Sequence, residues 1–152
     1  MPLSTLTERN APYGLRDAAE FAARFPDETA CLEFLWRGLC SEDGAHALCP
    51  RCRDTRRFKR YQTNPPRKSW TCTACGYHLH PTVGTVFEGS ATPLRAWFYA
   101  IFLAAHTERL TARSLQRSLG VTYKTAWRML HHIRERVPDQ ESFPRVFDRM
   151  PA

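Results

Sequence analysis

Two short cysteine pairs decide how the middle of this chain folds: "CPRC" at residues 49–52 and "CTAC" at residues 72–75. Together they form the pattern C-x2-C-x19-C-x2-C, a spacing that is typical of four-cysteine zinc sites. Two cysteines separated by two residues can turn both sulfurs toward one ion, and two such loops complete a tetrahedron around it. The sequence therefore predicts one structural Zn²⁺ bound by Cys49, Cys52, Cys72 and Cys75.

A redox-active dithiol and a chance spacing are the alternatives to a zinc site, and the repetition of the same spacing makes chance a poor explanation. Four thiolates around Zn²⁺ leave no open coordination position, so the site is expected to be structural and not catalytic. Cys31 and Cys40 lie outside the pattern, and we expect them to be buried small hydrophobic residues. His78 and His80 are expected to be strand residues, because four cysteines already complete the site.

The residues around the cysteine pairs read as short strands, so the segment is predicted to be a zinc ribbon. The stretches "RRFKRYQT" (56–63) and "RKSWTC" (67–72) are separated by the turn sequence "NPPR" (64–67). A third strand is expected within "YHLHPTVGTVF" (77–87). Gly76 follows the second pair, where a positive φ is often required.

An amphipathic helix is predicted just before the ribbon, in "DETACLEFLWRGL" (27–39). Asp27 is the expected N-cap, because its carboxylate can accept a hydrogen bond from a free amide of the first turn. The helical spacing gives one apolar side. That side carries Cys31, Leu32, Leu35, Trp36 and Leu39.

A second, more apolar helix is predicted from residue 93 to about residue 106. Thr92 is the expected N-cap, and Pro93 suits the first helical position. The apolar run at residues 96–105 is well short of the roughly 18 residues that span a bilayer. We therefore expect a buried central helix and no membrane association.

The stretch that follows has the pattern of a helix-turn-helix. Thr111 is expected to cap a short helix ending near Leu119, Gly120 to make the turn, and Thr122 to cap a longer helix to about Val137. The second helix of such a motif enters the major groove of DNA. An ordinary helical hairpin with solvated basic residues is the alternative. The residues expected on the outer, DNA-facing side are Tyr123, Lys124, Trp127, Arg128 and His131.

Positive charge is concentrated in the same part of the chain. Residues 44–134 hold 15 of the 22 Lys and Arg residues but only three of the 15 Asp and Glu residues. Such a block favours a polyanionic partner, because phosphate neutralisation supplies most sequence-independent affinity for nucleic acids; a solvated charged surface is the alternative. Arg51, Arg53, Arg56, Arg57 and Lys68 are also expected to offset the negative charge of the zinc site. The predicted DNA contacts in the ribbon are Arg56, Arg57, Lys59, Arg60 and Lys68.

Several motifs in order resemble the N-terminal region of a family of bacterial insertion-sequence transposases. The resemblance covers about residues 25–137 and includes "FPDETACLEFLWRGL", the two cysteine pairs, "HPTVGTVFEGS", "PLRAWFYAIFL" and "GVTYKTAWRMLHHIRE". In that family, a zinc ribbon and a helix-turn-helix precede an RNase H-like catalytic domain with an acidic, metal-binding triad. The resemblance implies that the ribbon and the helical segment recognise double-stranded DNA at the transposon ends.

The part of the chain after the last predicted helix departs from the family pattern. Its sequence is "PDQESFPRVFDRMPA" (138–152), and its acids are Asp139, Glu141 and Asp148. A segment of this length is not expected to form an RNase H-like sheet. We therefore expect a DNA-binding module without catalytic activity: a truncated transposase, a gene remnant or a separate DNA-binding subunit.

The sequence thus predicts an α+β chain with a small zinc ribbon followed by a three-helix helix-turn-helix unit. Further candidate partners are an intact transposase and a second copy of the chain. No secretory signal is recognised at the N-terminus, so the chain is expected in a bacterial cytoplasm, associated with the nucleoid. Rival functions are a small zinc-containing transcriptional regulator, a zinc-dependent nuclease and a protein-interaction ribbon. The expected division is a tail (1–24), the amphipathic helix plus ribbon (25–90), the helix-turn-helix unit (91–138) and a second tail (139–152).

Overall fold

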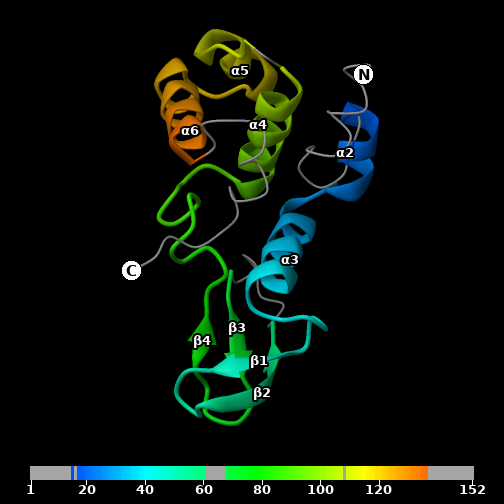
Figure 1. The fold of residues 1–152 in the computed structure, drawn as a ribbon, viewed down its shortest axis with the longest axis vertical. Helices are drawn as coiled ribbons and strands as arrows, with labels where there is room; N and C mark the ends of the chain where they lie inside the picture. The colour runs from blue at the N-terminus through cyan, green and yellow to red at the C-terminus, as the bar shows by residue number, and fades with distance from the viewer. Residues whose placement is uncertain (1–14, 16, 61–67, 108, 137–152) are drawn as a thin grey trace, which may run out of the picture.

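The described part of the chain is a mixed α+β structure with five helices and one four-stranded antiparallel sheet (Figure 1). It is seen in a computed structural model that describes residues 15, 17–60, 68–107 and 109–136. The elements in chain order are α2 (Ala18–Arg24), α3 (Glu28–Leu39), β1 (His46–Cys49), β2 (Asp54–Lys59), β3 (Trp70–Cys72), β4 (His78–Leu79), α4 (Leu94–His106), α5 (Ala112–Leu119) and α6 (Tyr123–Arg136).

The sheet has the strand order β1-β2-β3-β4. In its register Leu48 lies opposite Thr55, and Phe58 lies opposite Cys72. The two predicted strands before the second cysteine pair are present as β2 and β3, and the predicted turn at 64–67 lies outside the described residues. Strand β1 was not predicted, because its four residues are too few for an alternating pattern to be recognised.

The third predicted strand is present as β4, which contains only His78 and Leu79. The residues after it form consecutive turns, in which the N–H of Val83 donates to the carbonyl of His80 and the N–H of Thr85 to that of Thr82. Within these turns Gly84 has a φ of 78°, a left-handed conformation that glycine adopts readily. The strand expected within residues 77–87 is therefore confined to His78 and Leu79.

Helix α3 lies between the sheet and helix α4 (Figure 1). Near its C-terminal end the ring of Trp36 stacks on Trp70 of β3, with centroids 4.5 Å apart and an interplanar angle of 3°. Phe34 contacts Phe98 of α4 edge-on, at a centroid distance of 5.7 Å. One hydrophobic core therefore runs from the sheet to the helices. It extends across the domain boundary predicted after residue 90, and that boundary stays a prediction.

Helix α4 begins at Leu94 and is capped from another part of the chain. The expectation that Thr92 caps it was wrong, because Pro93 is the N-cap and makes no side-chain cap hydrogen bond. Instead, the carboxylate of Glu28 accepts hydrogen bonds from the N–H groups of Leu94 (2.6 Å) and Arg95 (3.1 Å). A carboxylate is favourable there because free amides and the helix dipole make the N-terminus positive.

Helix α2 was not predicted, and it lies inside the segment that was expected to be an N-terminal tail. Asp17 caps it by accepting a hydrogen bond from the N–H of Glu20. Phe21 is buried and contacts Tyr99 and Phe102 of α4 at centroid distances of 5.1 and 5.4 Å. A seven-residue helix owes its stability to such packing, so its sequence carries little periodic signal.

Helices α5 and α6 lie where the sequence predicts them, and each contacts α4 as well as the other. Thr111 and Ser114 form a capping box at the start of α5, and Gly120 ends it with a φ of 69°. Thr122 caps α6 by accepting a hydrogen bond from the N–H of Thr125 (3.2 Å). The predicted end of α6 at Val137 lies outside the described residues. Among the described residues, no helix combines the length and apolar character that a membrane span requires.

Candidate metal centre and nucleic-acid interface

The four cysteines of the two pairs lie together, with all four sulfur atoms within 4.8 Å of one another. The sulfurs of Cys49 and Cys75 are 3.5 Å apart. Four sulfurs at about 2.3 Å from a tetrahedral ion would lie about 3.8 Å from one another. The geometry therefore fits a metal ion bound by Cys49, Cys52, Cys72 and Cys75.

The local backbone explains why each pair points inward. Cys49 ends β1, and the turn that follows returns the chain to β2 through a hydrogen bond from the N–H of Arg53 to the Cys49 carbonyl (2.8 Å). Arg53 adopts a left-handed φ of 55°, which the sequence did not indicate. After the second pair, Gly76 has the expected positive φ (78°), and its N–H donates to the Cys72 carbonyl (2.9 Å).

The sulfurs interact strongly with one another and with nearby amides. Burial disfavours the Cys49 thiolate, but hydrogen bonds from the amides of Cys52 and Arg51 and from neighbouring thiols lower the pKa of Cys49 to about 7. Burial and hydrogen bonds with the other sulfurs raise the pKa of Cys75 to about 12. Four thiolates in this space repel one another, and a bound cation would relieve that repulsion.

The two remaining cysteines and the nearby histidines are not part of the cluster found among the described residues. Cys31 is fully buried in α3, as expected, and burial raises its pKa to about 12. Cys40 is half-buried and packs against the core. His78 lies on β4, as expected, and its Nδ1 is hydrogen-bonded to the Thr71 hydroxyl of β3 (2.9 Å). His80 follows the end of β4, so its expected place in a strand was wrong.

Helix α6 has one buried side and one exposed, basic side. Ala126, Met129 and Ile133 are buried, with at most 1% of their surface exposed. Lys124 and Arg128 are exposed on the opposite side. The predicted outward residues Tyr123 and Trp127 are 50% and 52% exposed, which is unusual for large aromatic residues. Trp127 stacks on His131, with ring centroids 5.0 Å apart.

The predicted basic residues of the ribbon do not share one environment. Arg57, Lys59 and Lys68 are exposed. Arg60 is half-buried, and its guanidinium lies over the ring of Trp70 at 5.4 Å. Arg56 is also half-buried and forms an ion pair with Asp54 (3.6 Å). The structure therefore groups Arg57, Lys59 and Lys68 as solvent-facing cations and separates them from Arg56 and Arg60.

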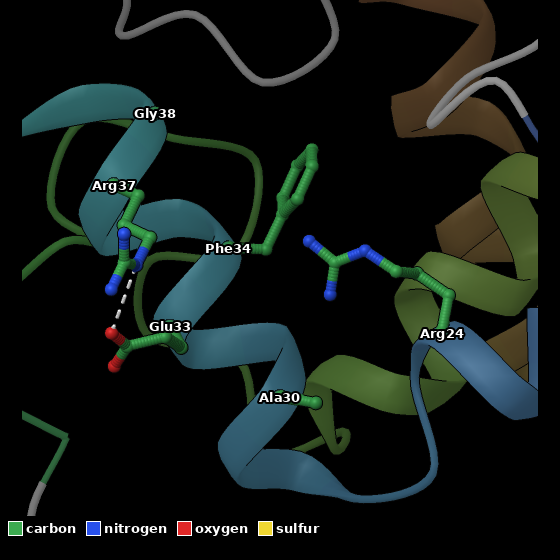
Figure 2. A pocket seen from close by; sticks show the side chains of 6 residues that line it. All are labelled: Arg24, Ala30, Glu33, Phe34, Arg37 and Gly38. Atoms are coloured by element: carbon green, nitrogen blue, oxygen red, sulfur yellow. Dashed lines mark hydrogen bonds and ion pairs between the residues drawn. The ribbon is translucent and has the colours of Figure 1, made fainter. Parts of the chain in front are cut away.

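A surface pocket of about 590 Å³ lies beside α3, and none of the four clustered cysteines lines it. Figure 2 shows the side chains that do. Arg24 reaches over it from the end of α2, and its guanidinium lies 5.8 Å from the ring centroid of Phe34. Arg37 is paired with Glu33 (3.2 Å). The sequence could not predict this pocket, because its walls come from two separately packed helices.

Comparison with known proteins connects the chain to a transposable element. An 80-residue segment is 34% identical to an uncharacterized protein in the transposable element ISH50 of Halobacterium salinarum. The matched segment covers 53% of this chain but only 26% of that protein. No protein-family model and no solved structure matches the chain. The chain is thus related in part to a protein of a transposable element.

Proposed function

We propose that this chain is the DNA-binding module of a transposase-type protein and recognises transposon-end DNA without cutting it. The observation that carries the proposal is the division of α6 into a buried apolar side and an exposed side with Lys124, Arg128 and two half-exposed aromatic rings. The relation to a protein of a transposable element supports the transposon context.

In the proposed module, α5 and α6 are a helix-turn-helix and α6 is the reading helix. The left-handed Gly120 and the Thr122 cap make a tight, well-defined turn between the two helices. Both observations are typical of helices that pack across a short turn. Lys124 and Arg128 are one helical turn apart, so both can address successive positions along a major groove.

The proposed metal is Zn²⁺ in a structural role. Four thiolates in a tetrahedral arrangement favour Zn²⁺ over harder cations, and they leave no position for a reactive water. The ion would hold the turn after β1 beside the turn after β3. Arg57, Lys59 and Lys68 would then lie on a stable sheet, where they can neutralise DNA phosphates.

Arg128→Ala should reduce discrimination between specific and random DNA. An Arg that makes a bidentate contact to guanine contributes about 1–3 kcal/mol of discrimination. Lys59→Ala should instead weaken binding to both DNAs evenly and lower the salt-dependence slope by about one, because a phosphate contact carries no sequence information. The measurement is the Kd of each variant at two salt concentrations, with a duplex selected by the wild-type protein and a scrambled duplex.

Arg113→Ala is a matched control, since Arg113 is exposed on α5 and not on the proposed reading side of α6. Its specific-to-random ratio should equal that of the wild type. If Arg128→Ala keeps the wild-type preference for specific over random DNA while Lys59→Ala abolishes that preference, the ribbon is the element that reads the sequence.

The isolated chain should neither cut nor join DNA in Mg²⁺ or Mn²⁺. Two-metal phosphodiester chemistry requires carboxylates that hold two ions about 4 Å apart. Among the described residues, the metal-binding cluster consists of cysteines alone, while Asp139, Glu141 and Asp148 lie outside them. The measurement is strand cleavage of labelled transposon-end duplexes. Cleavage that copurifies with the chain and survives replacement of these three acids would contradict the proposal.

A further inference from the structure

Among the described residues, two large aromatic side chains are strongly exposed, and both lie on the outward side of α6. Tyr123 is 50% exposed and Trp127 is 52% exposed. They are four residues apart in one helix, so their side chains lie on the same side of it. Apolar surface that gathers in one place on a protein is typical of a binding site. The outward side of α6 therefore offers apolar contacts as well as charge.

The ring of Trp127 is held against the helix before any partner binds. It stacks on the imidazole of His131, with ring centroids 5.0 Å apart and an interplanar angle of 7°. The Nε2 atom of His131 lies 3.2 Å from a carboxylate oxygen of Glu135 in the next turn. A side chain that is already ordered loses less conformational entropy when a partner covers it. Trp127 is thus a preorganised, half-exposed apolar surface.

Positive charge lies directly beside the two rings. Lys124 follows Tyr123 in the sequence, Arg128 follows Trp127, and both cations are exposed. Cations complement phosphates, whereas apolar rings complement the bases between the two backbones. Tyr123 is the first residue of α6, and Trp127 lies one turn later. In helix-turn-helix proteins, the N-terminal residues of the reading helix are the ones that contact base edges.

One chemical group in the major groove suits an apolar ring. The base edges there present hydrogen-bond donors and acceptors, and thymine alone adds a C5-methyl group. The faces of paired bases are stacked on one another in an intact duplex, so an indole cannot stack on them without separating the bases. Contact with a thymine methyl group buries part of the exposed ring and leaves the duplex intact.

We propose that Trp127 is a specificity-determining residue that reads thymine through apolar contact with its C5-methyl group, beside Tyr123. The inference rests on the proposed function, because α6 must be the reading helix. It goes beyond that function by naming the group that is recognised. Arg128 would read guanine through hydrogen bonds, and Trp127 would read thymine without one.

The test replaces each thymine of the duplex that the wild-type chain selects, one at a time, by deoxyuridine. This change removes only the methyl group and keeps the base pair. At one or more thymines, the Kd of the wild-type chain should rise about fourfold, since burying a methylene-sized group contributes about 0.8 kcal/mol and about 1.4 kcal/mol is a factor of ten. At the same positions, Trp127→Ala should bind the thymine and the uracil duplex equally.

Two control variants make the result specific. Leu48→Ala removes another strongly exposed apolar side chain (65%), which lies on β1 and not on α6, and it should keep the full methyl effect. Trp127→Phe keeps an aromatic ring at the same position and should keep part of the effect. Circular dichroism of each variant establishes that the helices are intact.

Specific binding by the wild type without any thymine-to-uracil effect would overturn the inference and leave the proposed function standing. Full sensitivity of Trp127→Ala at every such thymine would do the same. If Trp127→Ala dissociates a dimer in size-exclusion chromatography while its methyl effect is unaltered, the two rings belong to a contact between copies of the chain. If the wild type selects no duplex from a random pool, the proposed function fails and the inference fails with it.

Discussion

Cys72→Ser should release the metal ion and unfold the sheet while leaving most of the helical structure in place. Structural zinc contributes on the order of 10–16 kcal/mol in small zinc peptides at neutral pH, which is comparable with the whole stability of a domain. Cys72 is 2% exposed and lies opposite Phe58, so its loss removes a ligand and disturbs β2. Helices α4, α5 and α6 share buried residues of their own, including Ile101, Leu115 and Ile133.

The measurements are elemental analysis and circular dichroism in the far and near ultraviolet. Far-ultraviolet helicity should persist, while the near-ultraviolet signal of the Trp36–Trp70 stack should be lost. Cys40→Ser is the matched control, because Cys40 lies outside the cluster, and it should retain one zinc ion per chain. Wild-type protein that is purified without chelators and contains no zinc would refute the assignment of the metal.

Trp36→Ala should destabilise the protein by about 3–5 kcal/mol, the usual cost of removing a large buried aromatic side chain. Trp36 is fully buried, stacks on Trp70, and donates a hydrogen bond from Nε1 to the carbonyl of Gly44 (2.9 Å). Through this side chain α3 packs on the inner face of the sheet. The measurement is the free energy of unfolding of the zinc-loaded protein in urea.

Two further tryptophan variants make this prediction specific. Trp36→Phe keeps a ring but loses the hydrogen bond to Gly44, so it should cost less than the alanine variant. Trp127→Ala changes a residue that is 52% exposed, and its unfolding free energy should stay within about 0.5 kcal/mol of the wild type. Equal losses for Trp36→Ala and Trp127→Ala would show that the packing of α3 does not stabilise the sheet.

Local signals in the sequence were sufficient for the metal site and for α3, α5 and α6. The spacing of the cysteines places their sulfurs together because each pair is only a short turn. Asp27, Thr111 and Thr122 were recognised as caps because a cap interacts with amides two or three residues away. The apolar spacing of α6 likewise indicated its buried side. All of these interactions join residues that are close in sequence.

Contacts between distant residues decided the elements that the sequence did not predict. Glu28 replaces the predicted Thr92 cap from 66 residues away. Helix α2 forms where Phe21 can pack on α4. Neither contact leaves a local pattern, because each depends on how separate helices pack.

The sequence by itself determined that four cysteines gather and that a basic helix follows a capped turn. Both signals come from residues that are only a few positions apart in the sequence. Tertiary structure decided which basic residues of the ribbon face solvent and which are half-buried. Packing of Trp36 on one face of the sheet made that face the interior. Arg56 is thereby half-buried and paired with Asp54, whereas Arg57 is exposed to solvent, although the two residues are chemically identical neighbours in the sequence.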